Sequence, residues 1–287
     1  EIRVGEKQKN LPIEIWVNKP NRVKLSIVSP SGEVIDNLEA KNTNNERIKF
    51  LYEGTEMIVN FTSPELSTGD SLIFIRAYNL KAGIWKFRLT GQSIVDGKYY
   101  AWIPQRELLD SETKFLNSVG YTTLTLSSTS SGAISVAYYN QDDNSVISES
   151  GRGYTRYGMI KPDIAAGGFN AIVTNPGGGT AVISGSSVAG AVVAGCCALI
   201  LQWAVVDKNY PDIYAAQIKS YIISGAKGRP GDVYPNKEWG YGMFDMQGVF
   251  DRIRETYSPR SDEDYEEYRV NNLFIRMPKY RHNRTIN

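Results

Sequence analysis

One long apolar run limits the folds that this 287-residue chain can adopt. The run from Val188 to Val206, VAGAVVAGCCALILQWAVV, approaches the roughly 20 apolar residues of a transmembrane helix. Gln202 interrupts the run, Gly190 and Gly195 lie within it, and the polar residues DKN follow it directly. A central helix that is buried on all sides in a large α/β domain has the same pattern. We therefore expect such a buried helix, with a membrane-anchored β-domain protein as the alternative.

Charge and residue counts exclude several classes of partner and site. The chain has 32 Lys+Arg and 31 Asp+Glu, so its net charge of +1 gives no reason to expect a nucleic acid or an acidic membrane as partner. Its two cysteines, Cys196 and Cys197, are adjacent, which argues against a disulfide framework and favours buried small apolar residues. Its one histidine, His282, lies in the polar stretch KYRHNRTIN. We expect no cofactor and no metal.

Residues 1–112 are predicted to form one all-β unit. Apolar and polar residues alternate in LPIEIWVN and RVKLSIVS, as they do in half-buried strands. Further strands are expected at ERIKFLYEG, EMIVNFTS, DSLIFIRAYN and GIWKFRLTGQ, and DGKYYAWIPQ closes the region. Short strands separated by turn residues are typical of a sandwich or a jelly roll rather than of βαβ units.

Residues 113–257 combine short strands with helices. TTLTLSS, AISVAYYN, AIVTN and TAVISGSS are predicted strands, and the long apolar helix follows the last of them. IYAAQIKSYIISGA has helical spacing and ends at Gly225, and MFDMQGVFDRIRETY predicts a last short helix. The predicted parallel strands are too few for a complete doubly wound domain, so we expect part of an α/β layer.

The tail, residues 258–287, carries an acidic cluster followed by a basic one. This pattern is typical of a solvated chain end. The segment NNLFIRMP between the clusters is apolar enough to return as an edge strand or to dock on the body of the protein.

The stretch from Ser184 to Ala191, SGSSVAGA, lies where a β-like run meets the apolar helix. A serine at a helix N-terminus has its hydroxyl at the positive end of the helix dipole, and nearby backbone N–H groups are free to stabilise an oxyanion. The alternative is that Ser186 or Ser187 is an ordinary N-cap. The spacing alone does not exclude either role.

SGSSVAGAVVAGCCALILQW resembles the nucleophile segment of the subtilisin-like serine proteases, which reads Gly-Thr-Ser-x-Ala before a long central helix. Gly185, Ser187 and Ala189 match this pattern, and Ser186 replaces Thr. Upstream, KPDIAAGG at 161–168 resembles the family's Lys-Pro-Asp-Ile-x-Ala-Pro-Gly, and AISVAYYN resembles its Ile-Thr-Val-Gly-Ala strand. The resemblance implies that Ser187 is the catalytic nucleophile.

The likeness extends over nearly the whole chain. The all-β region, together with GRGYTRYGMIKPDIAA and YPNKEWGYGMFDMQGVF, resembles the clostridial spore-germination proteases (Csp), in which a jelly roll interrupts the subtilisin-like domain. It implies an all-β jelly-roll domain followed by the C-terminal half of a subtilisin-like α/β domain. It also implies a bacterial protein of the spore cortex or coat, and a protein substrate such as the precursor of a cortex-degrading hydrolase. EIRVGEKQKN shows no signal peptide.

The other parts of the family's active site are not present in this sequence. The triad of the family runs Asp, His, Ser, and neither the Asp motif, His-Gly-Thr nor the Gly-Asn that supplies the oxyanion asparagine precedes Ser187 here. A serine without a positioned base is a poor nucleophile, so this chain alone should not be a competent protease. We expect the Asp, the His and the oxyanion Asn on an N-terminal segment that is missing. The alternative is a pseudoprotease that acts in germination signalling or as a scaffold.

Four further features have simpler interpretations. The stretch Pro176–Gly179 predicts a β-turn, because no Lys follows as in a phosphate loop. Asp142 and Asp143 favour a turn over a calcium or acid/base site. Trp239 belongs to a predicted packing and turn element, and Arg152 has either a core role or a substrate role.

Overall fold

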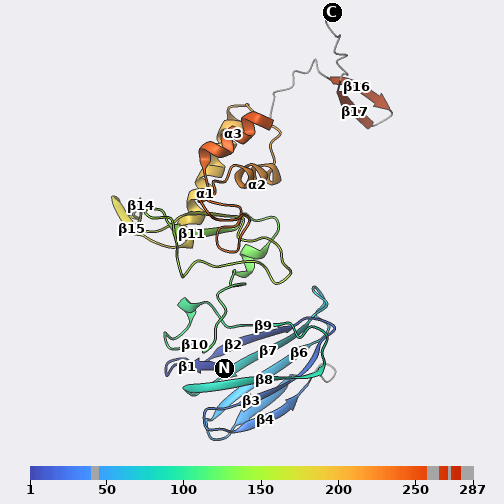
Figure 1. Ribbon diagram of the computed structural model, residues 1–287, viewed down its shortest axis with the longest axis vertical. Coiled ribbons are helices and arrows are strands. Elements are labelled where there is room, and N and C mark those ends of the chain that lie inside the picture. The colour runs from blue at the N-terminus through green and yellow to red at the C-terminus, as the bar shows by residue number, and fades with distance from the viewer. Residues whose placement is uncertain (40–44, 257–264, 271–272, 279–287) are drawn as a thin grey trace, which may run out of the picture. The chain divides into compact units, whose positions relative to one another are not determined.

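The computed structural model describes residues 1–39, 45–256, 265–270 and 273–278, and the last two ranges are described by their backbone. The chain divides into two compact units, Glu1–Val119 and Gly120–Asn287 (Figure 1). This division falls a few residues after the boundary expected at 112. Each unit has its own hydrophobic core.

The first unit consists of two five-stranded sheets in which all neighbouring strands are antiparallel. One sheet has the order β10 (Lys114–Phe115), β1 (Ile2–Val4), β8 (Gly83–Ser93), β3 (Arg22–Val28), β4 (Val34–Leu38). The other has the order β5 (Glu46–Phe50), β6 (Thr55–Thr62), β7 (Ser71–Tyr78), β2 (Leu11–Val17), β9 (Tyr99–Trp102). A short 3-10 helix, Arg106–Leu108, follows β9.

The alternating residues of the strands form the core between these two sheets. In β2 the alternate residues Leu11, Ile13, Ile15 and Val17 are buried. Trp85 of one sheet packs edge-on against Phe50 of the other, with ring centroids 4.9 Å apart. The strands expected from period-two alternation are therefore present, and they form a sandwich. A jelly-roll path for these strands stays a prediction.

A loop between β6 and β7 gives a testable pH dependence. The carboxylate of Glu65 accepts hydrogen bonds from the hydroxyls of Ser67 at 2.6 Å and Thr68 at 2.8 Å. These bonds stabilise the ionised form and lower the pKa of Glu65 from 4.5 to about 2. As the pH falls from 4.5 towards 2, the unfolded chain takes up the proton first. The free energy of unfolding should therefore fall in this window.

Carboxyl NMR titration of the folded protein should show a Glu65 midpoint near 2. Glu65→Gln should make the free energy of unfolding less dependent on pH between 2 and 4.5. A Glu65 midpoint near 4.5 would contradict this prediction.

The second unit is built around a short parallel pair of strands. β11 (Val136–Asn140) runs parallel to β13 (Ile164–Gly167), and β12 (Ser145–Val146) pairs antiparallel with the end of β11. β13 also bridges Met243 on its other side. Near the C-terminus, β16 (Tyr265–Val270) pairs with β17 (Leu273–Pro278), so the LFIRMP part of the predicted segment forms a strand.

The structure corrects one strand prediction in this unit and shows how two other predicted strands pair. TTLTLSS is not a strand but a loop with a 3-10 turn at Leu126–Thr129, where the hydroxyl of Thr129 donates to the carbonyl of Leu126 at 2.7 Å. Such local side-chain bonds compete with strand pairing. AIVTN and TAVISGSS form β14 (Ala171–Thr174) and β15 (Thr180–Ile183), which pair with each other as an antiparallel hairpin. They do not join the parallel sheet.

Three helices complete the described part of the second unit. α1 (Ser186–Leu201) continues as a π-helical turn, Gln202–Val206. α2 (Ala215–Ser224) ends at Gly225 as predicted, and α3 (Met246–Thr256) follows. α1 shares one core with β11, β13, α2 and α3, to which all five elements contribute buried residues.

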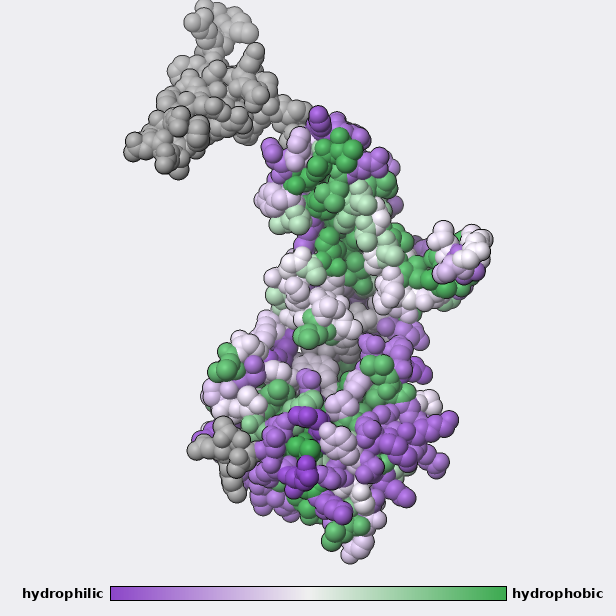
Figure 2. All heavy atoms as spheres, turned by 180° about the vertical axis from the view of Figure 1, so that it is seen from behind, coloured by the Kyte–Doolittle hydropathy of each residue, from purple (hydrophilic) through white to green (hydrophobic). Residues whose placement is uncertain are grey.

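The apolar helix is buried on one face and not on all sides. Its buried residues include Val188, Ala189, Val193 and Ile200, whereas Leu199 is 56% exposed and Val206 is 71% exposed. The expectation of complete burial is wrong. The other described elements pack against only one face of α1, so its opposite face is exposed. Figure 2 shows apolar residues at the surface of the unit that carries α1. By length and composition alone, Ser186–Val206 is also long and apolar enough to span a membrane.

Candidate functional site

Ser187 lies in the first turn of α1 with its side chain exposed. The N-cap is Gly185, whose φ of 149° and ψ of 165° suit glycine, and no side chain caps the helix. The alternative in which Ser186 or Ser187 is the N-cap is therefore wrong. The N–H of Val188 donates to the carbonyl of Gly185 at 3.1 Å, whereas the N–H groups of Ser186 and Ser187 have no carbonyl within the helix to pair with. Ser187 thus presents a hydroxyl beside available backbone donors.

The end of β13 holds the turn that precedes Ser187. The N–H of Gly185 donates to the carbonyl of Gly168 at 2.8 Å. A Cβ atom on Gly168 would lie 2.8 Å from the carbonyl oxygen of Gly185 and 3.1 Å from Cβ of Tyr138. The close backbone approach therefore requires glycine at 168. This contact explains in physical terms why KPDIAAGG and SGSS occur together.

A second set of hydrogen bonds closes the base of the β14–β15 hairpin. The backbone N–H of Asn170 donates to Oγ of Ser184 at 2.8 Å, and that hydroxyl lies 3.3 Å from Oδ1 of Asn170. Asn170 precedes β14 and Ser184 follows β15, so this pair joins both ends of the hairpin. The hairpin base and the start of α1 are therefore held by two sets of hydrogen bonds.

A buried charge network fixes the start of the parallel pair. Oδ2 of Asp163 lies 2.7 Å from Nζ of Lys161 and accepts the N–H of Ser135 at 2.7 Å, while Oδ1 lies 3.1 Å from Nζ of Lys219. Lys161 is 1% exposed and Asp163 is 3% exposed. Burial lowers the pKa of Lys161, and the neighbouring Asp163 carboxylate opposes that shift.

The network ties three parts of the second unit together. Ser135 precedes β11, Lys161 and Asp163 precede β13, and Lys219 lies on α2. The sequence analysis did not predict this network. Its signal was the Lys-Pro-Asp run of the segment that resembles the subtilisin-like proteases, but the Lys219 contact depends on tertiary structure.

The remaining sequence candidates have structural roles or lie elsewhere. Asp142 and Asp143 form the β11–β12 turn, in which Oδ1 of Asp143 accepts the N–H of Ser145 at 2.9 Å. Pro176–Gly179 forms the tip of the β14–β15 hairpin, and Gly177 has a φ of 99°. Both turn predictions are confirmed. His282 lies outside the described residues.

Arg152 and Trp239 take packing roles. Nε of Arg152 lies 3.5 Å from Oε1 of Glu238. Trp239 is 2% exposed, and its ring packs against that of Tyr139 with centroids 4.9 Å apart. The packing role predicted for Trp239 is confirmed, and the ion pair gives Arg152 a structural partner.

Cys196 and Cys197 are not part of a metal site among the described residues. Cys196 and Cys197 are half-buried on α1, and burial raises the pKa of both thiols. Within the described ranges, no three His, Cys, Asp or Glu side chains gather as a metal site would require.

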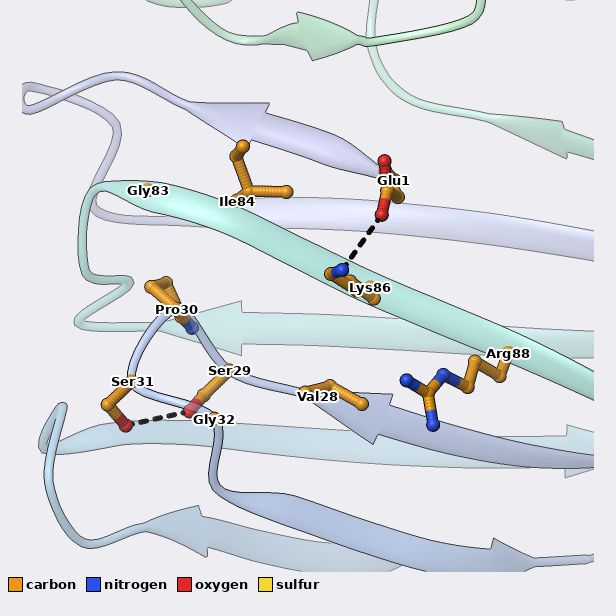
Figure 3. Close-up of a pocket in the computed structure, with 10 residues that line it drawn as sticks. All are labelled: Glu1, Val28, Ser29, Pro30, Ser31, Gly32, Gly83, Ile84, Lys86 and Arg88. Atoms are coloured by element: carbon orange, nitrogen blue, oxygen red, sulfur yellow. Dashed lines mark hydrogen bonds and ion pairs between the residues drawn. The ribbon is translucent and has the colours of Figure 1, made fainter.

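A surface hollow in the first unit shows no catalytic grouping. It is lined by Glu1, by residues of β3 and β8, and by the turn after β3, including Lys86, Arg88 and Ser31 (Figure 3). Nζ of Lys86 pairs with the carboxylate of Glu1 at 3.1 Å, and Oγ of Ser31 lies 3.1 Å from Oγ of Ser29. The hollow therefore has no base positioned beside a nucleophile, and Ser187 remains the candidate.

Comparison with known proteins shows what the second unit is similar to. Residues 114–242 match the subtilase family, Peptidase S8, and this range contains β11, β13 and all of α1 with Ser187. This segment is similar to the subtilases. The resemblance expected from the nucleophile motif is thereby confirmed.

Two relatives show how far the likeness extends. The chain is 30% identical over 172 residues to the subtilisin-like protease SBT6.1 of Arabidopsis thaliana, and the match covers 56% of this chain and 16% of that protein. The solved structure of the CspB protease of Clostridium perfringens superposes with a TM-score of 0.80 at 28% identity. That match covers 88% of this chain and 53% of the CspB chain. The chain thus spans about half the length of the CspB structure.

Proposed function

We propose that this chain is the C-terminal part of a serine endopeptidase and that Ser187 is its nucleophile. The observation that carries the proposal is the position of Ser187. It is exposed, it begins α1 in the subtilase segment, and glycine contacts hold the turn before it. In the intact enzyme, Oγ of Ser187 attacks the scissile carbonyl of a protein substrate. The backbone N–H of Ser187 donates to the oxyanion that forms.

The general base has to come from outside the described residues, which place no histidine beside Ser187. A His that accepts the proton of Ser187, an Asp that orients this His, and an oxyanion Asn would lie on an N-terminal subtilase segment. These are the groups that the Ser-His-Asp mechanism requires. In the same proposal, the chain without that segment is not a competent enzyme.

The exposed surface of the second unit supports such a partner segment. α1 carries apolar residues on a face that no other described element covers. β12 pairs with Tyr139 and Asn140 at the end of β11, so the first half of that edge has no strand neighbour among the described residues. A strand laid along this edge, with a layer over α1, would extend the sheet and bury the apolar face.

The finer parts of the proposal come from the likeness to the Csp proteases. We propose that the sandwich is a jelly-roll insertion that stabilises the domain, and that the protein acts in spore germination. Its substrate would be the precursor of a cortex-lytic hydrolase, and its location the spore cortex or coat. The proposal includes no cofactor and no nucleic-acid or membrane partner.

Labelling with a fluorophosphonate probe tests the proposed function. The full-length protein, including its N-terminal segment, should be modified at Ser187, and peptide mass spectrometry should locate the adduct. Ser187→Ala is the control and should abolish the label. A folded full-length protein that remains unlabelled would contradict the proposal. That result would favour a pseudoprotease that acts in signalling or as a scaffold.

A further inference from the structure

A strip of basic residues crosses the outer face of one sheet of the β-sandwich. Lys114 of β10 lies directly opposite Arg3 of the neighbouring strand β1. β1 in turn pairs with β8, in which Trp85 is buried, so that Lys86 and Arg88 lie on the outer face of the sheet. We call the four residues Lys114, Arg3, Lys86 and Arg88 the basic strip.

Three of the four charges have no acidic partner in the part of the chain that the structure describes. Arg3, Arg88 and Lys114 are exposed, and no ion pair joins them to a described carboxylate. Nζ of Lys86 pairs with Glu1 at 3.1 Å, and the two side chains are 45% and 42% exposed. Exposed ion pairs of this kind are weak and can exchange partners. The strip therefore keeps an excess of positive charge.

The direct opposition of Arg3 and Lys114 costs stability. Opposite residues of an antiparallel pair have Cβ atoms about 5 Å apart, and like charges at this distance repel each other. Among the five strands of this sheet, only β4 carries an acid, Asp36, and it lies at the edge opposite β10. A net charge of +1 for the whole chain thus coexists with a local excess of cations. An anion from outside the sheet would relieve the repulsion.

The hollow shown in Figure 3 adjoins the basic strip. Lys86 and Arg88 line it together with Pro30, the hydroxyl of Ser31 and Ile84. In Figure 3 no interaction joins Arg88 to another lining residue. The hollow therefore combines a guanidinium that can pair with a carboxylate and an apolar wall that can receive an uncharged side chain.

The arrangement of the strip favours an extended acidic polypeptide over other polyanions. Successive outward residues of β8 are about 7 Å apart, which is also the repeat of the side chains on one face of an extended peptide. Guanidinium groups bind carboxylates through two parallel hydrogen bonds. Single-stranded nucleic acids are usually bound with the help of aromatic side chains on which bases stack. The aromatic residues of this sheet, Trp85, Phe87 and Phe115, all belong to the core instead.

We propose that the basic strip binds an extended acidic segment of a partner polypeptide, whose carboxylates pair with Arg88 and with the opposed Arg3 and Lys114. A further side chain on the same face of the segment packs against Pro30 in the hollow. The site lies within the first unit, and it does not depend on a reaction at Ser187.

Fluorescence anisotropy with a labelled octapeptide in which Glu and Thr alternate tests this site. The full-length protein carries Ser187→Ala in every sample, so that cleavage cannot remove the probe. We expect binding that weakens as the salt concentration rises, because exposed charges are screened. An octapeptide of alternating Gln and Thr should not bind. The strip variant Arg3→Gln, Arg88→Gln should bind the Glu-Thr peptide about tenfold or more weakly.

The matched control variant carries Arg47→Gln and Lys49→Gln. It removes two exposed charges from β5, which belongs to the other sheet. It should bind the Glu-Thr peptide as tightly as the parent protein does. The melting temperature of the strip variant should stay the same or rise, because the repulsion between Arg3 and Lys114 is relieved.

Three results would overturn the proposal. The first is a parent protein that does not bind the Glu-Thr peptide, or a strip variant that binds it equally well. The second is a lowered melting temperature of the strip variant, since the two arginines would then have partners within the protein. The third is a single-stranded oligonucleotide that binds the strip more tightly than the peptide, which would indicate a nucleic-acid partner instead. No arm measures activity at Ser187, so each result leaves the proposed function as it stands.

Discussion

Ser187→Ala should lower kcat/KM of the full-length protein on a peptide substrate by about four to six orders of magnitude. The effect is large because, in the proposed mechanism, the hydroxyl forms the covalent acyl-enzyme bond, and alanine offers no atom to form it. Residual turnover above the uncatalysed rate should remain, since oxyanion donors and substrate contacts persist. Initial rates at several substrate concentrations, with the melting temperature measured alongside, give the result.

Ser186→Ala is the matched control for this prediction. Ser186 precedes Ser187 in the same helical turn and is also exposed, so its loss alters the same surface without removing the proposed nucleophile. We expect less than about a tenfold change in kcat/KM, about 1.4 kcal/mol in transition-state stabilisation. Equal activity of Ser187→Ala and the wild type would show that another group reacts.

Asp163→Asn should lower the free energy of unfolding by about 3–5 kcal/mol. The substitution keeps the shape of the side chain but removes the charge that neutralises Lys161 and Lys219, at 2.7 Å and 3.1 Å. Two ammonium groups would then share a buried site without a counterion. Urea unfolding of the full-length protein, followed by tryptophan fluorescence, measures the loss from the shift of the midpoint at constant slope.

Asp251→Asn controls for the general effect of removing a carboxylate. Asp251 pairs with Arg254 at 3.2 Å on the outside of α3, where both side chains are largely exposed. Such surface pairs contribute about 0–1 kcal/mol, so this variant should unfold close to the wild type. A similar small loss for Asp163→Asn would mean that water or a nearby anion compensates the two lysines.

Features coded by local pattern could be predicted from the sequence. The sandwich strands follow from period-two alternation, as in β2, whose alternate residues all enter the core. α2 and its end at Gly225 follow from helical spacing and a C-terminal glycine. The segment around Ser187 could be matched to the family because its motif is short and contiguous, and the same range lies within the subtilase match. The catalytic role of Ser187 stays a prediction.

Features that depend on distant partners could not be predicted in this way. A strand-like run does not show which strand it will pair with, so the β14–β15 hairpin was not distinguished from strands of the parallel sheet. The exposed face of α1 was missed because an apolar run indicates that burial is favourable but not whether a covering layer is at hand. The contact between Lys219 and Asp163 joins α2 to a loop far away in the sequence.

The hydrogen bonds at the base of the β14–β15 hairpin have an evolutionary consequence. Asn170 bonds to Ser184, and Gly168 bonds to Gly185. The residues between these hydrogen-bonded pairs therefore form a loop whose two ends are held together. Insertions, deletions or exchanges at its glycine-rich tip can accumulate without displacing Ser187, as is general for loops carried on a rigid scaffold. Lineages that share this scaffold can therefore vary the length and sequence of the hairpin while inheriting Ser187 in an unchanged position.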